Sequence, residues 1–467
     1  MIDRTGKNRS GAVTRRRLLG AAGGGFALAT GLGSQSFTAR AQDRVNLPFW
    51  APGGSPVYCD TQSQIAADYA QLNQNIAVEF QCGTGDSYME QLLGSIAAGN
   101  PPEATILWDT PVSLAVQGAL RPLDDLMPTG EYTPFENWPE NVLASSQFDG
   151  QTWGIPVVSP TYGIWYNEEL FEAKGIPSDR ASFPKTWDEL RKLSKEFTQW
   201  DGDRLVSAGF VFFNVGPYTL GGTIPVWSAL NGGRLYDAEN QRYTIDAEQN
   251  VEMFEYFLAW LDEEYQGNAA AALRSGAWGM SPSDEGQPPA FQAGNLAMTE
   301  MGSFGMGDIY AYGEPAFTRW NVAPYPVGPS GTETVAGYWP SWLAIPAGTE
   351  HPEEMFGYLD YLSGVGVQKW FAAVPDLPTN RKVETLVPEI VVEKRGEEFA
   401  QDIVGFFRSQ FEVATPMWDS PIQSYAIDQL MTAMNNIYGK QASVTDALAE
   451  AQRACQAELE KVLASNS

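Results

Sequence analysis

Acidic and aromatic side chains occur together where short strand-like runs of the sequence end. Trp50 closes the first run, Asp86 follows the second, and Trp108 and Asp109 follow the third. An ionised carboxylate accepts hydrogen bonds and cannot donate them, so Asp86 and Asp109 are candidates for binding hydroxyl groups of a solute. Each aspartate also precedes a helical pattern, where it could equally serve as a helix cap. Both interpretations stay open here.

The elements that must position these residues alternate between strand and helix. Apolar runs lie at 45–50, 77–81 and 105–108, and segments with helical periodicity separate them. This alternation predicts an α/β fold, in which a parallel sheet is covered by helices. Ligands of such sheets bind at the carboxyl ends of the strands, where the residues named above lie. Further along, Thr186 and Glu189 form the pattern of a capping box at the start of a helix.

The histidine and cysteine content excludes several kinds of chemistry. His351 is the single histidine, so a histidine zinc site is excluded and any Ser-His-Asp triad would depend on this one residue. Its position before Pro352 is typical of a helix start. We predict no metal and no cofactor. Cys59 and Cys82 are each read as lying near a strand end and can pair in an oxidising compartment, whereas Cys455 is expected to be buried and inert.

The N-terminus has the three parts of an export signal. Arg15, Arg16 and Arg17 precede an uncharged stretch over 20–37, and Ala39-Arg40-Ala41 follows. The paired arginines indicate the twin-arginine route, cleavage after Ala41 and a periplasmic location. The stretch could instead be a membrane anchor, but it is rich in glycine and short for a bilayer span. No cysteine before Cys59 is available for lipid attachment.

The charge and length of the chain restrict its partners and its domain count. Residues 1–41 hold seven of the 29 basic residues and one of the 57 acidic residues, so the remainder carries a formal charge of −34. Nucleic acid and anionic lipid bind basic surfaces, and both are therefore unexpected partners. More than 400 residues exceed the usual size of one domain, which predicts two lobes.

Several local patterns occur in an order that is specific to one family. An example is Pro184-Lys-Thr-Trp-Asp-Glu-Leu190. The full series lies at 86–104, 118–125, 150–156, 166–171, 184–190, 231–233, 290–303 and 323–328. In this order the sequence resembles the family 1 extracellular solute-binding proteins of ABC importers, the group that includes maltose-binding protein.

The resemblance implies a periplasmic binding protein fold, in which two α/β lobes joined by three chain crossings close on a ligand. By analogy the crossings are expected near 159–164, 297–300 and 343–346. The N-terminal lobe would then contain 42–160 and 300–344. The C-terminal lobe would contain 161–299 and 345–467, including a helical C-terminal extension.

The resemblance also implies a sugar or oligosaccharide ligand, because flat aromatic rings and hydroxyl-directed polar groups occur where it places the cleft loops. Ordinary core packing is the alternative for each ring, and a surface ion pair is the alternative for the arginine. The candidate ligand-binding residues are Trp50, Asp86, Trp108, Asp109, Tyr162, Tyr218, Trp227, Ser303, Phe304, Trp339 and Arg381.

Other functions remain as alternatives. A polyamine would suit carboxylates among aromatic walls, and a glycerol phosphate would need basic groups that the expected cleft loops lack. An exported glycoside hydrolase would need two carboxylates at a defined separation, and no spacing selects such a pair. We therefore expect a monomeric binding protein without enzymatic activity. It would deliver a small carbohydrate to the membrane permease subunits of an ABC importer.

Overall fold

The computed structural model describes residues 44–53, 56–83, 88–213, 220–274, 276, 278–279, 288–311, 319–384, 386–417 and 420–465. The predicted signal peptide, residues 1–41, lies outside these ranges. Within them, none of the helices has both the length and the apolar character that a membrane span requires.

Five strands form the first sheet, in the order β2-β1-β3-β15-β6. Strand β1 (Val45–Ala51) runs parallel to β2 (Ile76–Cys82) and to β3 (Ala104–Leu107), as the sequence predicts. Strand β15 (Ser341–Ala344) runs antiparallel to β3 and to β6 (Ile155–Val158). The sheet is therefore mixed, but the carboxyl ends of β1, β2 and β3 still share one edge.

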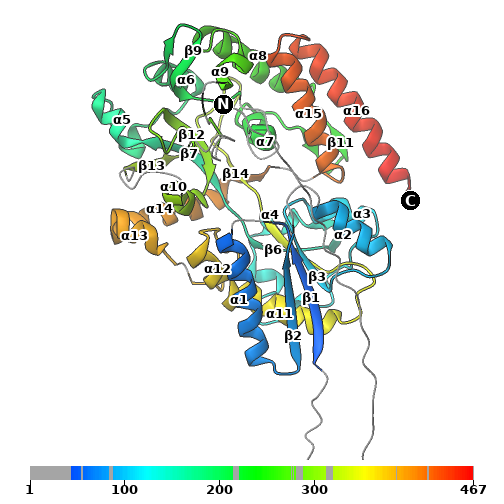
Figure 1. Cartoon of the computed structure of the whole chain (residues 1–467). Helices are drawn as coiled ribbons and strands as arrows, with labels where there is room; N and C mark the ends of the chain where they lie inside the picture. Colours follow the sequence, from blue (N-terminus) through cyan, green and yellow to red (C-terminus); the bar gives the residue numbers. More distant parts are fainter. Residues whose placement is uncertain are drawn as a thin grey trace, which may run out of the picture. The chain divides into compact units, whose positions relative to one another are not determined.

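Helices from both halves of the chain pack on this first sheet (Figure 1). Tyr358 from the C-terminal half contacts Phe49 of β1 edge to face, with ring centroids 5.3 Å apart. These elements make up the first lobe. Its other elements are α1 (Pro56–Leu72), α2 (Tyr88–Ala97), α3 (Pro111–Val116), α4 (Glu140–Ala144), β4 (Gln147–Phe148), β5 (Gln151–Thr152), α11 (Pro352–Tyr361) and α12 (Val367–Ala373).

The second sheet has the order β13-β7-β12-β9-β8. Strand β7 (Tyr162–Asn167) pairs antiparallel with β12 (Leu296–Gly302) and with β13 (Trp320–Ala323). Strand β9 (Arg204–Phe210) pairs parallel with β12 and antiparallel with β8 (Gln199–Asp201). With its own, larger hydrophobic core, this sheet forms the second lobe, which confirms the two-lobed α/β fold.

Local sequence signals explain where helices of the second lobe begin. The Thr186 hydroxyl accepts a hydrogen bond from the Glu189 amide while the Glu189 carboxylate accepts one from the Thr186 amide, so the predicted capping box is present.

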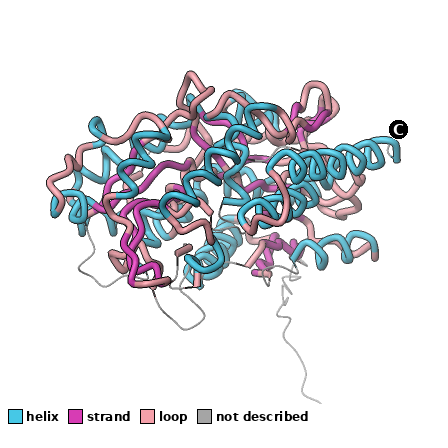
Figure 2. The backbone as a smooth tube through the Cα atoms, turned by 90° about the horizontal axis from the view of Figure 1, so that it is seen from above, coloured by secondary structure: helices cyan, strands magenta, loops and turns pink. Residues whose placement is uncertain are grey.

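Helices α15 and α16 lie side by side at the C-terminal end (Figures 1 and 2). The helices are α5 (Glu168–Ala173), α6 (Trp187–Lys195), α7 (Leu220–Leu230), α8 (Glu248–Glu264), α9 (Ala269–Leu273), α10 (Gly305–Ala311), α13 (Glu389–Arg395), α14 (Glu397–Ser409), α15 (Gln423–Tyr438) and α16 (Val444–Ser465), and the short strands are β10 (Tyr236–Asp237), β11 (Arg242–Tyr243), β14 (Ala336–Tyr338) and β16 (Ala414–Pro416).

The chain passes between the two lobes three times. The first passage, 159–161, joins β6 to β7 and agrees with the prediction. The second, 339–340, joins β14 to β15. The third lies between Val383, which is buried in the core of the first lobe, and Leu386, which packs against the core of the second.

The other two crossings differ from the positions expected by analogy. Strand β12 stays within the second sheet as far as Gly302 because it pairs with β7 and β9, so no passage occurs at 297–300. Strand β15 stays within the first sheet, so none occurs at 343–346. Consequently strands β12 and β13 belong to the second lobe and strand β15 to the first, unlike in the expected arrangement.

A disulfide joins Cys59 and Cys82, with 5.8 Å between their Cα atoms. Cys82 ends β2, as expected, but Cys59 lies in the first turns of α1 rather than at a strand end. The bond therefore fixes the start of α1 to the sheet edge at which the β1–β3 strands end. Cys455 is a free cysteine buried in α16, which confirms the prediction that it is buried.

Replacing both Cys59 and Cys82 with serine should lower the free energy of unfolding by about 3 kcal/mol, because the disulfide closes a loop of 23 residues in the unfolded chain. Urea denaturation of the double variant and the parent protein checks this. Equal midpoints and equal slopes would show that the bond contributes nothing to stability.

Candidate ligand-binding site

The loop after β3 presents a carboxylate at the carboxyl edge of the first sheet. β3 is buried along its whole length, and Trp108 and Asp109 follow it as half-buried residues. The cap of helix α3 is Thr110, whose hydroxyl accepts a hydrogen bond from the Val112 amide. Thr110 therefore caps this helix, and the interpretation of Asp109 as a helix cap is wrong.

The Asp109 carboxyl group is held in a poorly solvated position. Burial raises its pKa above the ordinary value. Among the described residues no hydrogen bond or ion pair engages this carboxylate, so its oxygens are available to a ligand. Asp109 is thus an acceptor at the edge where α/β sheets bind their ligands.

Backbone hydrogen bonds join the first passage, 159–161, to three other segments of the chain. The Trp339 amide donates to the Pro160 carbonyl at 3.3 Å, which joins the first and second passages. The Ser159 amide donates to the Leu377 carbonyl at 2.9 Å, and the Ser303 amide donates to the Thr161 carbonyl at 3.0 Å. This network forms a hinge in which the first and second passages run side by side.

Trp339 connects the hinge to the β3 loop. Its indole N–H donates to the Trp108 carbonyl at 2.5 Å. The ring packs both against the core of the second lobe and against a small cluster of the first lobe that contains Leu107 and Trp342. Trp50, half-buried on β1, packs on that same cluster. The structure thus brings Trp50, Trp108, Asp109 and Trp339 into one region.

Tyr162 and Phe304 lie on the opposite side of the hinge. Tyr162 begins β7, Phe304 follows β12, and their rings meet edge to face with centroids 6.0 Å apart. Phe304 is half-buried and can offer part of its ring to a ligand. The Ser303 hydroxyl is fully buried and has no hydrogen-bond partner among the described residues. These three candidates thus lie together in the second lobe, next to the hinge.

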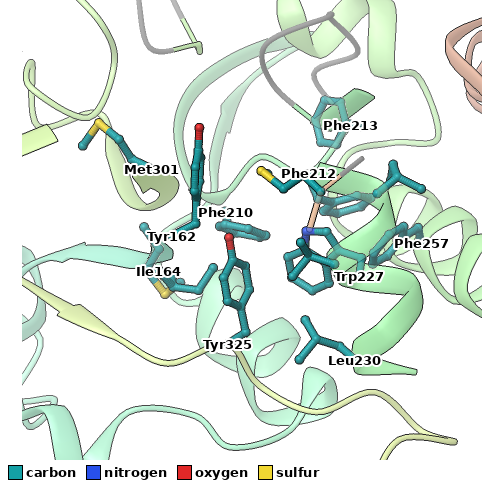
Figure 3. Packing of buried hydrophobic residues seen from close by; sticks show 14 of the residues in the cluster. Tyr162, Ile164, Phe210, Phe212, Phe213, Trp227, Leu230, Phe257, Met301 and Tyr325 are labelled. Carbon is teal, nitrogen blue, oxygen red and sulfur yellow. The ribbon is translucent and has the colours of Figure 1, made fainter. Parts of the chain in front are cut away.

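Trp227 belongs to the core of the second lobe rather than to a binding surface. Its side chain has no exposed area and packs among Phe210, Phe257 and Leu230 (Figure 3). Its indole N–H donates to the Glu300 carboxylate at 3.0 Å. A ligand could not stack on this ring without rearrangement of the core.

Replacing Trp227 with phenylalanine should lower the free energy of unfolding by roughly 2 kcal/mol and leave ligand affinity unchanged, because core volume and a buried hydrogen bond are lost outside the site. Thermal denaturation and calorimetric titration of the variant check the two halves. Weaker binding without loss of stability would show that Trp227 contacts the ligand after all.

Arg381 is not brought to the other candidates. Its amide donates to the Asn137 carbonyl of the first lobe at 2.7 Å, and its side chain is exposed. The segment 374–384 does approach the hinge, but through Leu377 rather than Arg381. Asp86 and Tyr218, the remaining candidates, lie outside the described residues.

Three half-buried acidic residues near the hinge were not identified from the sequence. Burial raises the pKa of Glu300 to about 7, although the Tyr325 hydroxyl donates to it at 2.5 Å. Burial also raises the pKa of Asp376 to about 7 and that of Asp308 to about 6, and the nearby Asp308 carboxylate raises the Asp376 value further. Local sequence gives no signal for these residues, because their burial depends on contacts between distant segments.

The donor set does not suit a metal ion. Among the described residues no three histidine, cysteine, aspartate or glutamate side chains gather where they could hold one. What the arrangement offers is aromatic surface and hydrogen-bonding groups from two lobes on either side of a hinge. That combination defines a protein that binds a small molecule between two lobes.

Comparison with known proteins agrees with this class. The family of bacterial extracellular solute-binding proteins matches residues 60–369, so the chain belongs to that family. The resemblance seen in the sequence is thereby confirmed. Members of the family are binding proteins, which supports the absence of enzymatic activity at the family level.

Individual relatives are distant in sequence and close in fold. A relative from Brucella abortus (strain 2308) is 30% identical over 122 residues, which are 26% of this chain and only 28% of that protein. The structure of CpMnBP1 with mannotriose bound has a TM-score of 0.71 at 20% identity and covers 88% of this chain and 99% of that one. The GacH receptor of Streptomyces glaucescens, solved with acarbose, has a TM-score of 0.69 at 20% identity, with coverage of 89% and 98%.

Proposed function

We propose that this protein is the solute-binding component of an ABC importer and that it traps a neutral oligosaccharide between its lobes. The observation that carries the proposal is that both lobes place candidate residues next to the hinge: Trp108, followed by Asp109, accepts a hydrogen bond from Trp339 of the second passage, and Tyr162 and Phe304 flank the Thr161–Ser303 hydrogen bond. Sugars have apolar faces that stack on rings and hydroxyl groups that donate to carboxylates. Solved structures of the same fold hold mannotriose and acarbose.

Closure of the hinge would follow from contacts on both sides. A ligand that touches only one lobe has the same interactions whether the lobes are apart or together, and it cannot shift that equilibrium. An oligosaccharide that reaches both Asp109 and Phe304 stabilises the closed arrangement. The closed monomer would then dock on the permease subunits in the membrane.

The location of the protein forms part of the proposal. Residues 14–41 have the composition of a twin-arginine signal, and export to the periplasm with cleavage after Ala41 would place the binding protein beside its permease. N-terminal sequencing of the protein recovered from the periplasmic fraction tests this. A chain that starts at Gln42 is expected, and an intact N-terminus would contradict the proposed cleavage.

A thermal-shift screen followed by calorimetry tests the ligand class. The chain without residues 1–41 should be stabilised by mannotriose, maltotriose or acarbose, and chromatography of the incubated sugar should show no hydrolysis. Product release would identify a glycoside hydrolase instead. Absence of any shift with a broad set of oligosaccharides would reject a carbohydrate ligand.

A cationic ligand is the second candidate, because one observation favours it. Asp109, Glu300, Asp308 and Asp376 lie near the hinge, and in the described part of the chain no lysine or arginine forms a salt bridge with any of them. An amine would neutralise such a site, whereas a glycerol phosphate would be repelled by it. Spermidine and glycerol 3-phosphate therefore belong in the same screen. Stabilisation by spermidine without any response to sugars would select the polyamine.

A further inference from the structure

The β3 loop is held at both ends by residues from outside the first lobe's own core. The Trp108 carbonyl accepts the indole N–H of Trp339, which lies in the second passage. The Thr110 amide donates to the side-chain oxygen of Gln423 at 2.9 Å. Asp109 lies between these two hydrogen bonds. The loop therefore belongs to the first lobe, but its hydrogen bonds join it to the second passage through Trp108 and to the second lobe through Thr110.

Gln423 is the residue of the second lobe that makes this contact. It is the first residue of α15, which packs against α7, α8 and α16 and contributes Ala426 and Leu430 to the core of that lobe. The Gln423 side chain is 1% exposed and Thr110 is fully buried. The amide N–H of Thr110 is thus enclosed where the lobes touch.

The Thr110 side chain cannot replace this interaction. Its hydroxyl donates to the Ser145 carbonyl at 3.2 Å and caps α3, so it is fully engaged within the first lobe. A buried amide without a partner is costly, whereas an exposed amide binds water at little cost. The Gln423 bond therefore matters only when the lobes are together.

Another hydrogen bond between the lobes can be replaced by water when the lobes separate or stay together. The Asn141 side chain donates to the Phe411 carbonyl at 3.2 Å, but Asn141 is exposed and water can take its place. Of these contacts, those at Trp108 and Thr110 adjoin the candidate ligand carboxylate. The position of Asp109 is consequently linked to the relative position of the two lobes.

We propose that Gln423 and Trp339 are positioning residues that clamp the Trp108–Thr110 loop to the second lobe, so that they set the equilibrium between open and closed lobes and align Asp109 for the ligand. The ligand part of this inference rests on the proposed function. The conformational part does not depend on it and can be tested without any ligand.

The test measures the separation of the lobes in the ligand-free chain. Cysteines replacing Gln147 and Ala238 carry spin labels, because these exposed residues face a gap of about 210 Å³ that both lobes line. Double electron–electron resonance spectroscopy then gives the distribution of distances between the two spin labels. In Gln423→Leu, the ratio of open to closed molecules should rise roughly ten-fold to a hundred-fold, since the Thr110 amide loses its partner in the closed state. Gln429→Leu, on the same helix, is the matched control and should leave the distribution unchanged.

Trp339→Phe provides a second variant that keeps most of the ring and removes the donor to Trp108. It should shift the same distribution in the same direction, and circular dichroism verifies that both variants are folded. Distributions identical to the parent in both variants would overturn the clamp. Titration of the same variants with mannotriose and maltotriose separates the two proposals: if neither sugar binds the parent, the proposed function fails while the distances still decide the clamp. A shifted distribution with unchanged sugar affinity would refute the link to Asp109.

Discussion

Replacing Asp376 with asparagine should make the protein more stable at pH 8 by about 4 kcal/mol while changing its stability at pH 4 by less than about 1 kcal/mol. Burial raises the pKa of the Asp376 carboxyl group from 3.8 to about 7, helped by the neighbouring Asp308. In the unfolded chain the group ionises near pH 4, so above that pH folding must either protonate it or bury its charge. Asparagine keeps an oxygen that accepts the Trp370 indole N–H and carries no charge.

The direction of this pH dependence follows from the raised pKa. Between about pH 4 and pH 7 the folded protein binds the proton that the unfolded chain has released, so the stability of the wild type falls as pH rises through this range. Urea denaturation of both proteins at pH 4, 6 and 8 measures the difference. Asp428→Asn, at an exposed position of α15, is the control and should follow the wild type. If the stabilities of Asp376→Asn and the wild type changed with pH in the same way, Asp376 would not be the cause of the pH dependence.

Replacing Asp109 with alanine should weaken oligosaccharide binding by about 2 kcal/mol, or roughly thirty-fold, because hydrogen bonds to a charged acceptor contribute about that much. Stability should change little, since no described residue forms a hydrogen bond or ion pair with the Asp109 carboxylate. Removal of a half-buried charge favours the folded state if anything.

Calorimetric titration with mannotriose and maltotriose measures the affinity of Asp109→Ala, and thermal denaturation measures its stability. Asp428→Ala removes an equivalent charge at an exposed position away from the hinge and should bind as the wild type does. Wild-type affinity in Asp109→Ala would remove this residue from the site. A large loss of stability would show that the carboxylate supports the fold instead.

Features encoded within short segments were predictable from the sequence. β1, β2 and β3 were found because their apolar runs are separated by helical periodicity, and such alternation leaves few arrangements other than a sheet covered by helices. The capping box at Thr186 was found because its two hydrogen bonds depend on residues three positions apart. The loop with Trp108 and Asp109 follows directly from these strands, whereas the first passage was placed by the family resemblance.

Features set by distant contacts were not predictable. Trp227 carries the same sequence signal as a stacking tryptophan, and only the packing of Phe210 and Phe257 around it shows that it is core. Strand pairing between segments more than 100 residues apart keeps 297–300 in the second sheet and 343–346 in the first, so the analogy misplaced both of these crossings. Gln423 contacts Thr110 across 313 positions, and nothing in its neighbourhood distinguishes it from other helix residues.

Hydrogen–deuterium exchange of the chain without residues 1–41, with and without millimolar mannotriose or maltotriose, tests the central claim most directly. If an oligosaccharide is held between the lobes, amides at 108–112 of the first lobe and at 302–308 of the second should both exchange more slowly in its presence, together with the hinge segment 159–162. Protection confined to one lobe, or no change at any of these segments, would contradict a ligand site formed by both lobes.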